Sequence, residues 1–287
     1  MTTFINFLLQ PLSYEFMQRG MIAAVLAGIV CAVVGTYIVL RGMAFFGDAL
    51  AHTILPGIAL GYLVSGGARD VLFWWALGTA IIAALGIGAI SKNAEIKEDT
   101  AIGIIFAGMF ALGIALISTV KSYAVDLTHF LFGDVLSVSS QSLWLILIFG
   151  GLVLLAVFAF YKEFMTLSFD PILATTLRLP VGFLNNLLLT LIAVTVAVSL
   201  QTVGVALMVA MLVTPAATAY LLTHRLSTMM VLAAVFASLS GVIGLYLSFY
   251  LSIASGAAVV LTATVFFMVA FVWKKAGEYN SLFNRHF

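Results

Sequence analysis

Charged residues are scarce in this chain of 287 residues. Only 8% of the residues are charged, whereas an average soluble domain has about 25%. The mean hydropathy is +1.23, which excludes a soluble globular protein. The net charge of +1 gives no overall field that would attract nucleic acid. We therefore expect a lipid bilayer around the chain and no nucleic-acid partner.

Cysteine and the common catalytic motifs are also missing or nearly so. Cys31 is the single cysteine, which excludes an internal disulfide and any metal site built from several thiolates. The chain has no HExxH motif of zinc proteases, no GxSxG motif of serine hydrolases and no GxxxxGK[ST] phosphate-binding loop. We expect a protein that is not an enzyme. If it transports a solute actively, the energy must come from an ion gradient or from a separate ATPase subunit.

Long apolar runs dominate the rest of the chain. Each run has about 20 residues, the length that a helix needs to cross a bilayer. The pattern predicts an all-α polytopic membrane protein. The sixth and seventh runs are separated only by a short turn near Gln201 to Gly204, so eight spans is the alternative to nine. The expected spans are approximately residues 20–40, 44–65, 71–90, 100–120, 141–160, 184–201, 203–222, 229–250 and 255–273.

The distribution of basic residues predicts how the chain is oriented, since lysine and arginine are enriched on the cytoplasmic side. With the C-terminus inside, the inner connections carry nine basic residues and the outer ones three, and the N-terminus lies outside. We expect an interfacial segment at 1–18, one transmembrane domain at 19–275 and a cytoplasmic tail at 276–287. The inner residues are Arg41, Lys92, Lys97, Lys162, Arg178, Arg225, Lys274, Lys275 and Arg285; the outer ones are Arg19, Arg69 and Lys121.

An acid and a histidine interrupt the second apolar run. Asp48 and His52 are four residues apart, with Pro56 a further four along, so all three share one face of a helix. The other acids fall in loops, at span edges or in tails. An acid at mid-span costs roughly 2.5–3.5 kcal/mol, so such a residue indicates function. Counted from Arg41 at the inner interface, helical rise puts Asp48 about 10 Å and His52 about 16 Å into a core of about 30 Å.

The chemistry of this pair suits a divalent metal. One carboxylate oxygen and one imidazole nitrogen give two ligands, and a second copy of the chain would give four. That set satisfies tetrahedral zinc, or manganese or ferrous iron with added water or backbone oxygen. Two alternatives stay open. Asp48 and His52 could form a purely structural pair, or they could relay protons in an ion-driven carrier.

Two connections between spans carry further signals. In the inner loop 161–182, Asp170 suits a helix N-cap, Pro171 the first helical position and Arg178 the C-terminal end, where a cation complements the helix dipole. This predicts a short cytoplasmic helix that inserts into a partner, which favours a separate ATPase. The outer loop at 121–140 could guide metal inward, although a solvated or docking surface is favoured. Its polar residues are Asp126, His129 and Asp134.

Several segments together resemble a known family. The segment LRGMAFFGDALAHTILPGIALGY is similar to the signature of integral-membrane permease subunits of manganese/zinc/iron ABC importers. The similarity continues through EDTAIGIIFAGMFALGIALIS, LTHFLFGDVLSVS, SFDPILATTLRLP and QTVGVALMVAMLVTPAATAYLLTHR, and covers nearly the whole chain. It implies a permease bundle like that of type II ABC importers, in the bacterial cytoplasmic membrane. It also implies a dimer that binds cytoplasmic ATP-binding subunits and receives metal from an extracytoplasmic metal-binding protein.

The resemblance also implies roles for individual residues. Asp48 and His52 would be the transmembrane metal ligands, the segment Asp170–Arg178 the coupling helix, and Pro56, Thr214 and Pro215 part of the pathway or its gate. The expected function is import of a divalent metal by alternating access, with manganese favoured over zinc and iron. ATP would bind the partner subunit, and no cofactor would be held permanently. The alternatives are a permease for a chelated metal and a gradient-driven carrier.

Overall fold

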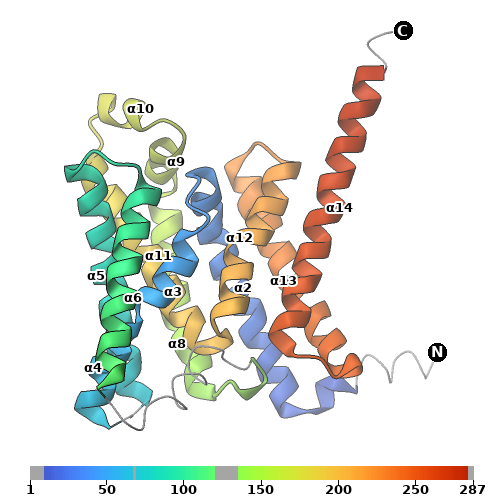
Figure 1. Ribbon diagram of the computed structural model, residues 1–287. Helices are drawn as coiled ribbons and strands as arrows, with labels where there is room; N and C mark the ends of the chain where they lie inside the picture. Colours follow the sequence, from blue (N-terminus) through green and yellow to red (C-terminus); the bar gives the residue numbers. More distant parts are fainter. Residues whose placement is uncertain (1–9, 67–68, 120–134, 284–287) are drawn as a thin grey trace.

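The computed structural model describes residues 10–66, 69–119 and 135–283 (Figure 1). Within these ranges the chain is helical and contains no strand, which confirms the all-α prediction. Nine segments of the described chain are long and apolar enough to cross a membrane, as expected. The helices are α2 Glu15–Leu40, α3 Phe46–Thr53, α4 Leu55–Ser65, α5 Arg69–Asn93, α6 Glu98–Ser118, α8 Ser140–Ala159, α9 Tyr161–Phe169, α10 Pro171–Thr176, α11 Val181–Val203, α12 Val205–Leu222, α13 Leu226–Leu251 and α14 Ser255–Phe283.

The centre of the bundle is α2, which packs against α8, α11, α12 and α13. Small residues let these helices approach closely, as is common in membrane bundles. A Cβ atom built on Gly35 would lie 1.8 Å from the Leu212 carbonyl oxygen of α12, so the two backbones are in direct contact. A Cβ on Gly28 would lie 3.3 Å from the Cβ of Ala237 of α13. The core of the protein therefore lies along α2.

The two ends of the bundle differ. Figure 1 shows α9 and α10 at the end where α14 finishes, and the start of α2 at the opposite end. We call the first of these the α10 end. The connections that follow α2, α5, α8 and α12 lie there, and they hold most of the basic residues expected on the cytoplasmic side. The alternation of helices thus agrees with the predicted orientation.

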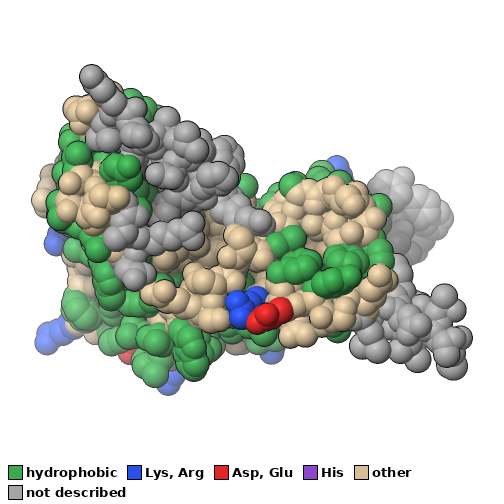
Figure 2. Space-filling model, turned by 90° about the horizontal axis from the view of Figure 1, so that it is seen from below, with side chains coloured by type: hydrophobic (Ala, Val, Ile, Leu, Met, Phe, Trp, Pro, Cys, Tyr) green, Lys and Arg blue, Asp and Glu red, His purple; other side chains and the backbone are tan. Residues whose placement is uncertain are grey.

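The opposite end carries few charges. Figure 2, which views the molecule from that side, shows mainly hydrophobic side chains and backbone, with charged side chains sparse. Near the start of α2, Arg19 forms an ion pair with Glu15 within the same helix. This surface fits the small number of basic residues predicted for the outer side.

The sixth and seventh spans are separate helices. Gly204 alone joins α11 to α12, and its φ of 81° is a conformation that other residues rarely adopt. The count of nine is therefore confirmed over the alternative of eight. The close spacing had made the count ambiguous because a single glycine can turn the chain without any polar loop.

Several boundaries differ from the sequence prediction. The first spanning helix begins at Glu15, so part of the segment expected to lie at the interface belongs to α2. The expected coupling loop contains a second helix, α9, before the predicted short one. The last helix continues as far as Phe283, through most of the segment expected as a tail. In each case, apolar or helix-compatible residues extend the helix past the bilayer-spanning run.

Candidate metal site

The helix that carries Asp48 and His52 starts after a sharp turn. The α2 helix ends with Gly42 at a φ of 70°, and the Met43 amide donates to the Ile38 carbonyl at 3.0 Å. This is the hydrogen-bond pattern of a Schellman C-cap. Because residues 41–45 are not helical, the depth estimate that counted helical rise from Arg41 is wrong. Figure 1 nevertheless places α3 near mid-height in the bundle.

The predicted pair comes together in the structure. Asp48 Oδ1 lies 3.8 Å from His52 Nε2, and the two side chains are 35% and 31% exposed. The separation is too long for a hydrogen bond between them. A tetrahedral metal with bonds of about 2.1 Å would hold two ligand atoms about 3.4 Å apart. A change of a few tenths of an ångström would therefore let both atoms bind one ion.

Aromatic rings of α6 surround the imidazole on its other side. The ring centroids of Phe106 and Phe110 lie 6.0 and 5.7 Å from that of His52, both edge-on. The Nδ1 atom is buried and has no hydrogen-bond partner among the described residues. Nε2 is the nitrogen that faces Asp48. Nε2 is therefore the nitrogen that is placed to share a cation with Asp48.

Pro56 accounts for a break in the spanning helix just after the pair. A regular helix would need the amide of residue 56 to donate to the His52 carbonyl, and proline has no amide hydrogen. The α3 helix ends at Thr53, and α4 starts at Leu55 with Pro56 in its first turn. The second span is therefore two short helices. Pro56 acts on the site through the backbone, at the residue that follows the imidazole face.

Among the residues that the structure describes, a single chain supplies only this pair. Among the described residues, no group of three or more histidine, cysteine, aspartate or glutamate side chains is placed to hold a metal. Water, backbone oxygen or a second subunit must complete any site here. Asp126, His129 and Asp134, which were predicted to guide or dock, lie outside the described residues.

The predicted gate segment lies on a helix that contacts α3. A Cβ on Gly47 would lie 2.4 Å from a methyl group of Leu212, so α12 packs directly beside Asp48. Thr214 and Pro215 follow Leu212 by less than one turn, and Pro215 is buried inside α12. The structure thus brings this helix to the pair. The role of Thr214 and Pro215 as a gate stays a prediction.

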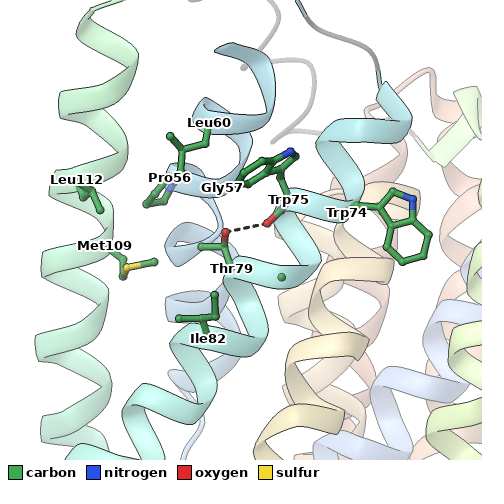
Figure 3. Close-up of a pocket in the computed structure, with 10 residues that line it drawn as sticks. Pro56, Gly57, Leu60, Trp74, Trp75, Thr79, Ile82, Met109 and Leu112 are labelled. Carbon is green, nitrogen blue, oxygen red and sulfur yellow. Dashed lines mark hydrogen bonds between the residues drawn. The ribbon is translucent and has the colours of Figure 1, made fainter. Parts of the chain in front are cut away.

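An apolar groove of about 440 Å³ lies beside the pair but does not include it. Figure 3 shows its wall formed by α4, α5 and α6, with the Thr79 hydroxyl donating to the Trp75 carbonyl at 2.8 Å. Met109 is the sole sulfur in the lining. This wall offers no set of metal ligands. The lining residues are Pro56, Gly57, Leu60, Trp74, Trp75, Gly78, Thr79, Ile82, Met109 and Leu112.

The predicted short helix at the α10 end forms as expected at its start. Asp170 caps it by accepting a hydrogen bond from the Leu173 amide at 2.9 Å, and Pro171 is its first residue. Ile172 and Leu177 are 78% and 58% exposed. A surface of this kind outside the membrane suits contact with a partner protein.

Arg178 is placed differently from the prediction. The α10 helix ends at Thr176, and Arg178 lies beyond it with a φ of 55°. Its amide donates to the Thr175 carbonyl at 2.9 Å, and the next amide donates to the Ala174 carbonyl at 3.1 Å. Arg178 therefore occupies the left-handed position of a Schellman C-cap, where glycine is usual. The expectation that it lies within the helix end is corrected accordingly.

Sequence reasoning missed the surroundings of Arg41. Its side chain is only 12% exposed, and Nη2 donates to Glu98 Oε1 at 2.5 Å and to Asn185 Oδ1 at 2.6 Å. Burial lowers the pKa of the Arg41 guanidinium, and the Glu98 carboxylate opposes that change. The expected interfacial marker is instead the centre of a polar contact between helices.

Known proteins resemble this chain over most of its length. The manganese transport system membrane protein MntC of Listeria monocytogenes is 48% identical over 262 residues, which are 91% of this chain and 92% of MntC. The chelated iron transport system membrane protein YfeD of Yersinia pestis is 37% identical over 277 residues, 95% of this chain and 90% of YfeD.

A solved structure shares the fold. The structure of PsaBC from Streptococcus pneumoniae in complex with Fab contains a chain that is 39% identical. The TM-score is 0.79, and the match covers 93% of this chain and 95% of that one. This similarity confirms the expected permease bundle. Residues 13–274 match the ABC 3 transport family, and the chain therefore belongs to that family of metal transporter permeases.

Proposed function

We propose that this chain is the membrane permease of an ATP-driven importer that moves a divalent transition metal, manganese foremost, into the bacterial cytoplasm. The observation that carries the proposal is the approach of Asp48 Oδ1 to His52 Nε2 at 3.8 Å in the middle of a spanning segment. A carboxylate and an imidazole are ligands that manganese, zinc and ferrous iron all accept. The names of the relatives support manganese first and iron second.

The transport cycle follows from this placement. Metal delivered from outside by an extracytoplasmic metal-binding protein binds Asp48 and His52. A second permease copy, water or backbone oxygen completes the coordination. Two ATP-binding subunits dock at the α10 end, where the capped helix exposes Ile172 and Leu177. ATP binding and hydrolysis in these subunits move α10, and the bundle opens inward to release the metal.

Uptake of radioactive manganese tests the site. The permease is reconstituted in proteoliposomes with its ATP-binding subunit and metal-binding protein. Asp48→Ala and His52→Ala should each reduce uptake to background, because each removes one of two ligands. His224→Ala is the matched control, since His224 is exposed in the connection between α12 and α13. Normal uptake in both pair variants at equal protein levels would overturn the assignment.

Competition separates the remaining function classes. An excess of free manganese, zinc or ferrous ion should reduce uptake of labelled manganese, whereas chelated forms should not. Uptake should require hydrolysable ATP and should persist when ionophores collapse ion gradients. Uptake that follows the gradient and not ATP would favour a carrier instead.

A further inference from the structure

Arg41 joins three helices at the α10 end. It follows directly after α2, and its Nη2 atom donates to Glu98 Oε1 at 2.5 Å, in the first turn of α6, and to Asn185 Oδ1 at 2.6 Å, in the second turn of α11. Within the ranges that the structure describes, this is the only ion pair of an arginine or lysine that joins two different helices. It is therefore a specific link between α2, α6 and α11.

The same segments meet again closer to the metal pair. Four residues after Arg41, the ring of Phe45 lies 5.8 Å from that of Phe106, edge-on. Phe106 is eight residues beyond Glu98, about 12 Å along α6, and its ring also contacts His52. The chain leading to α3 is thus fastened to α6 by a polar contact near the α10 end and by an aromatic contact next to His52.

We propose that Arg41, Glu98 and Asn185 form a latch that closes the metal pair toward the α10 end, and that movement of α10 releases it. Residues 177–180 connect α10 directly to α11, and Asn185 is the fifth residue of α11. A displacement of α10 therefore reaches Asn185 through a short, hydrogen-bonded connection. Withdrawal of Asn185 removes one of the two acceptors of the Arg41 guanidinium. The α6 end can then swing away with Phe106 and uncover His52.

The contact has the character of a releasable link. The Arg41 side chain is mostly buried, but the Glu98 side chain is 25% exposed and can be hydrated when the pair opens. The other terminal nitrogen, Nη1, is buried without a hydrogen-bond partner among the described residues. A buried donor that lacks a partner makes the closed arrangement less stable than a fully paired one. An open arrangement that satisfies this donor can therefore compete.

Thiol labelling tests the latch. In a Cys31→Ser background, Phe110→Cys places one thiol beside His52, further along α6 than Phe106. The permease and its ATP-binding subunit are prepared in inside-out vesicles, and a membrane-impermeant maleimide is added from the α10 side. Glu98→Gln and Asn185→Ala should each raise the labelling rate several-fold. Glu15→Gln, which removes the acid of the Arg19 pair at the opposite end, should leave the rate unchanged.

The effect of ATP on the labelling rate is the second part of the test. Hydrolysable ATP with magnesium should raise labelling in the parent protein and add little in the Glu98→Gln and Asn185→Ala variants, whose latch is already open. Unchanged labelling in both variants, with both monodisperse, would overturn the proposal. If Glu98→Gln fails to assemble, Asn185→Ala decides alone. The proposed latch rests on the proposed function, because it closes the proposed metal site. The labelling experiment itself needs no metal transport. A labelling response without metal uptake would therefore reject the function and keep the latch.

Discussion

Pro56 stands four residues after His52, at the position whose amide would bond to the His52 carbonyl in a regular helix. Proline has no amide hydrogen to give, and the spanning segment separates into α3 and α4 at this point. Asp48 and His52 therefore lie in the first and the last turn of a short helix. Its orientation is set by a break and not by a continuous helix.

Replacing Pro56 should affect metal binding more than stability. Pro56→Ala restores the missing donor and favours a continuous helix by up to about 3 kcal/mol in intrinsic propensity. A continuous helix would turn Asp48 and His52 relative to α6, and we expect metal affinity to fall about tenfold. Calorimetric titration with manganese measures the affinity. Pro11→Ala, in the short helix that precedes α2, is the control, and an equal loss of affinity there would contradict the explanation.

Gly113 of α6 packs against the break between α3 and α4, and we expect this position to have no room for a side chain. A Cβ on Gly113 would lie 2.7 Å from the Leu55 Cβ and 3.1 Å from the Pro56 nitrogen. We expect Gly113→Ala to destabilise the protein by about 1–3 kcal/mol through overpacking. Thermal unfolding in detergent measures the effect. Gly108→Ala on the same helix is the control, since its Cβ would meet no described atom within 4 Å. Equal melting temperatures of the two variants would refute the prediction.

The N-cap of α10 should matter for communication with the ATPase. Asp170→Ala removes the acceptor of the Leu173 amide and should destabilise this short helix by about 1 kcal/mol. Manganese-stimulated ATP hydrolysis by the assembled transporter should fall, while metal binding to the permease stays unchanged. Asp170→Asn keeps a good capping group and should retain activity. Loss of activity in both variants would indicate that the charge matters and not the cap.

Two substitutions of Arg178 distinguish the effect of its backbone conformation from the effect of its charge. Its φ of 55° costs a non-glycine residue roughly 1 kcal/mol. Arg178→Gly should therefore raise the melting temperature slightly, and Arg178→Ala should not. If the guanidinium contacts the ATP-binding subunit, both variants should bind that subunit more weakly in a pull-down from purified components. Normal binding in both would restrict Arg178 to a structural role.

The spans and the acid–histidine pair could be predicted from sequence because both depend on local composition. Apolar runs of bilayer length specify the helices, and Asp48 and His52 are conspicuous within one of them. The i, i+4 spacing was enough to bring the two side chains together. The cap at Asp170 was predictable for the same reason, since the Asp-Pro pair acts within one helical turn.

Features that depend on contacts distant in sequence could not be predicted. Arg41 contacts Glu98 and Asn185, which are 57 and 144 residues away in the sequence. The periodicity of apolar residues does not predict contacts at such separations. The aromatic wall around His52 comes from α6, whose phenylalanines look like ordinary lipid-facing residues in the sequence. The break at Pro56 was visible in principle. Its consequence depended on whether neighbouring helices would hold the two halves apart.

The glycine contacts along α2 distinguish closely packed helices from one with an open face. At Gly35 the α2 backbone touches that of α12, and at Gly28 it meets Ala237 of α13, so these helices cannot slide past one another without a collision. In contrast, Cβ atoms on Gly103 and Gly108 of α6 would meet no described atom within 4 Å. The backbones of α2, α12 and α13 are thus locked against one another, whereas this part of α6 leaves an open face on the surface of the bundle.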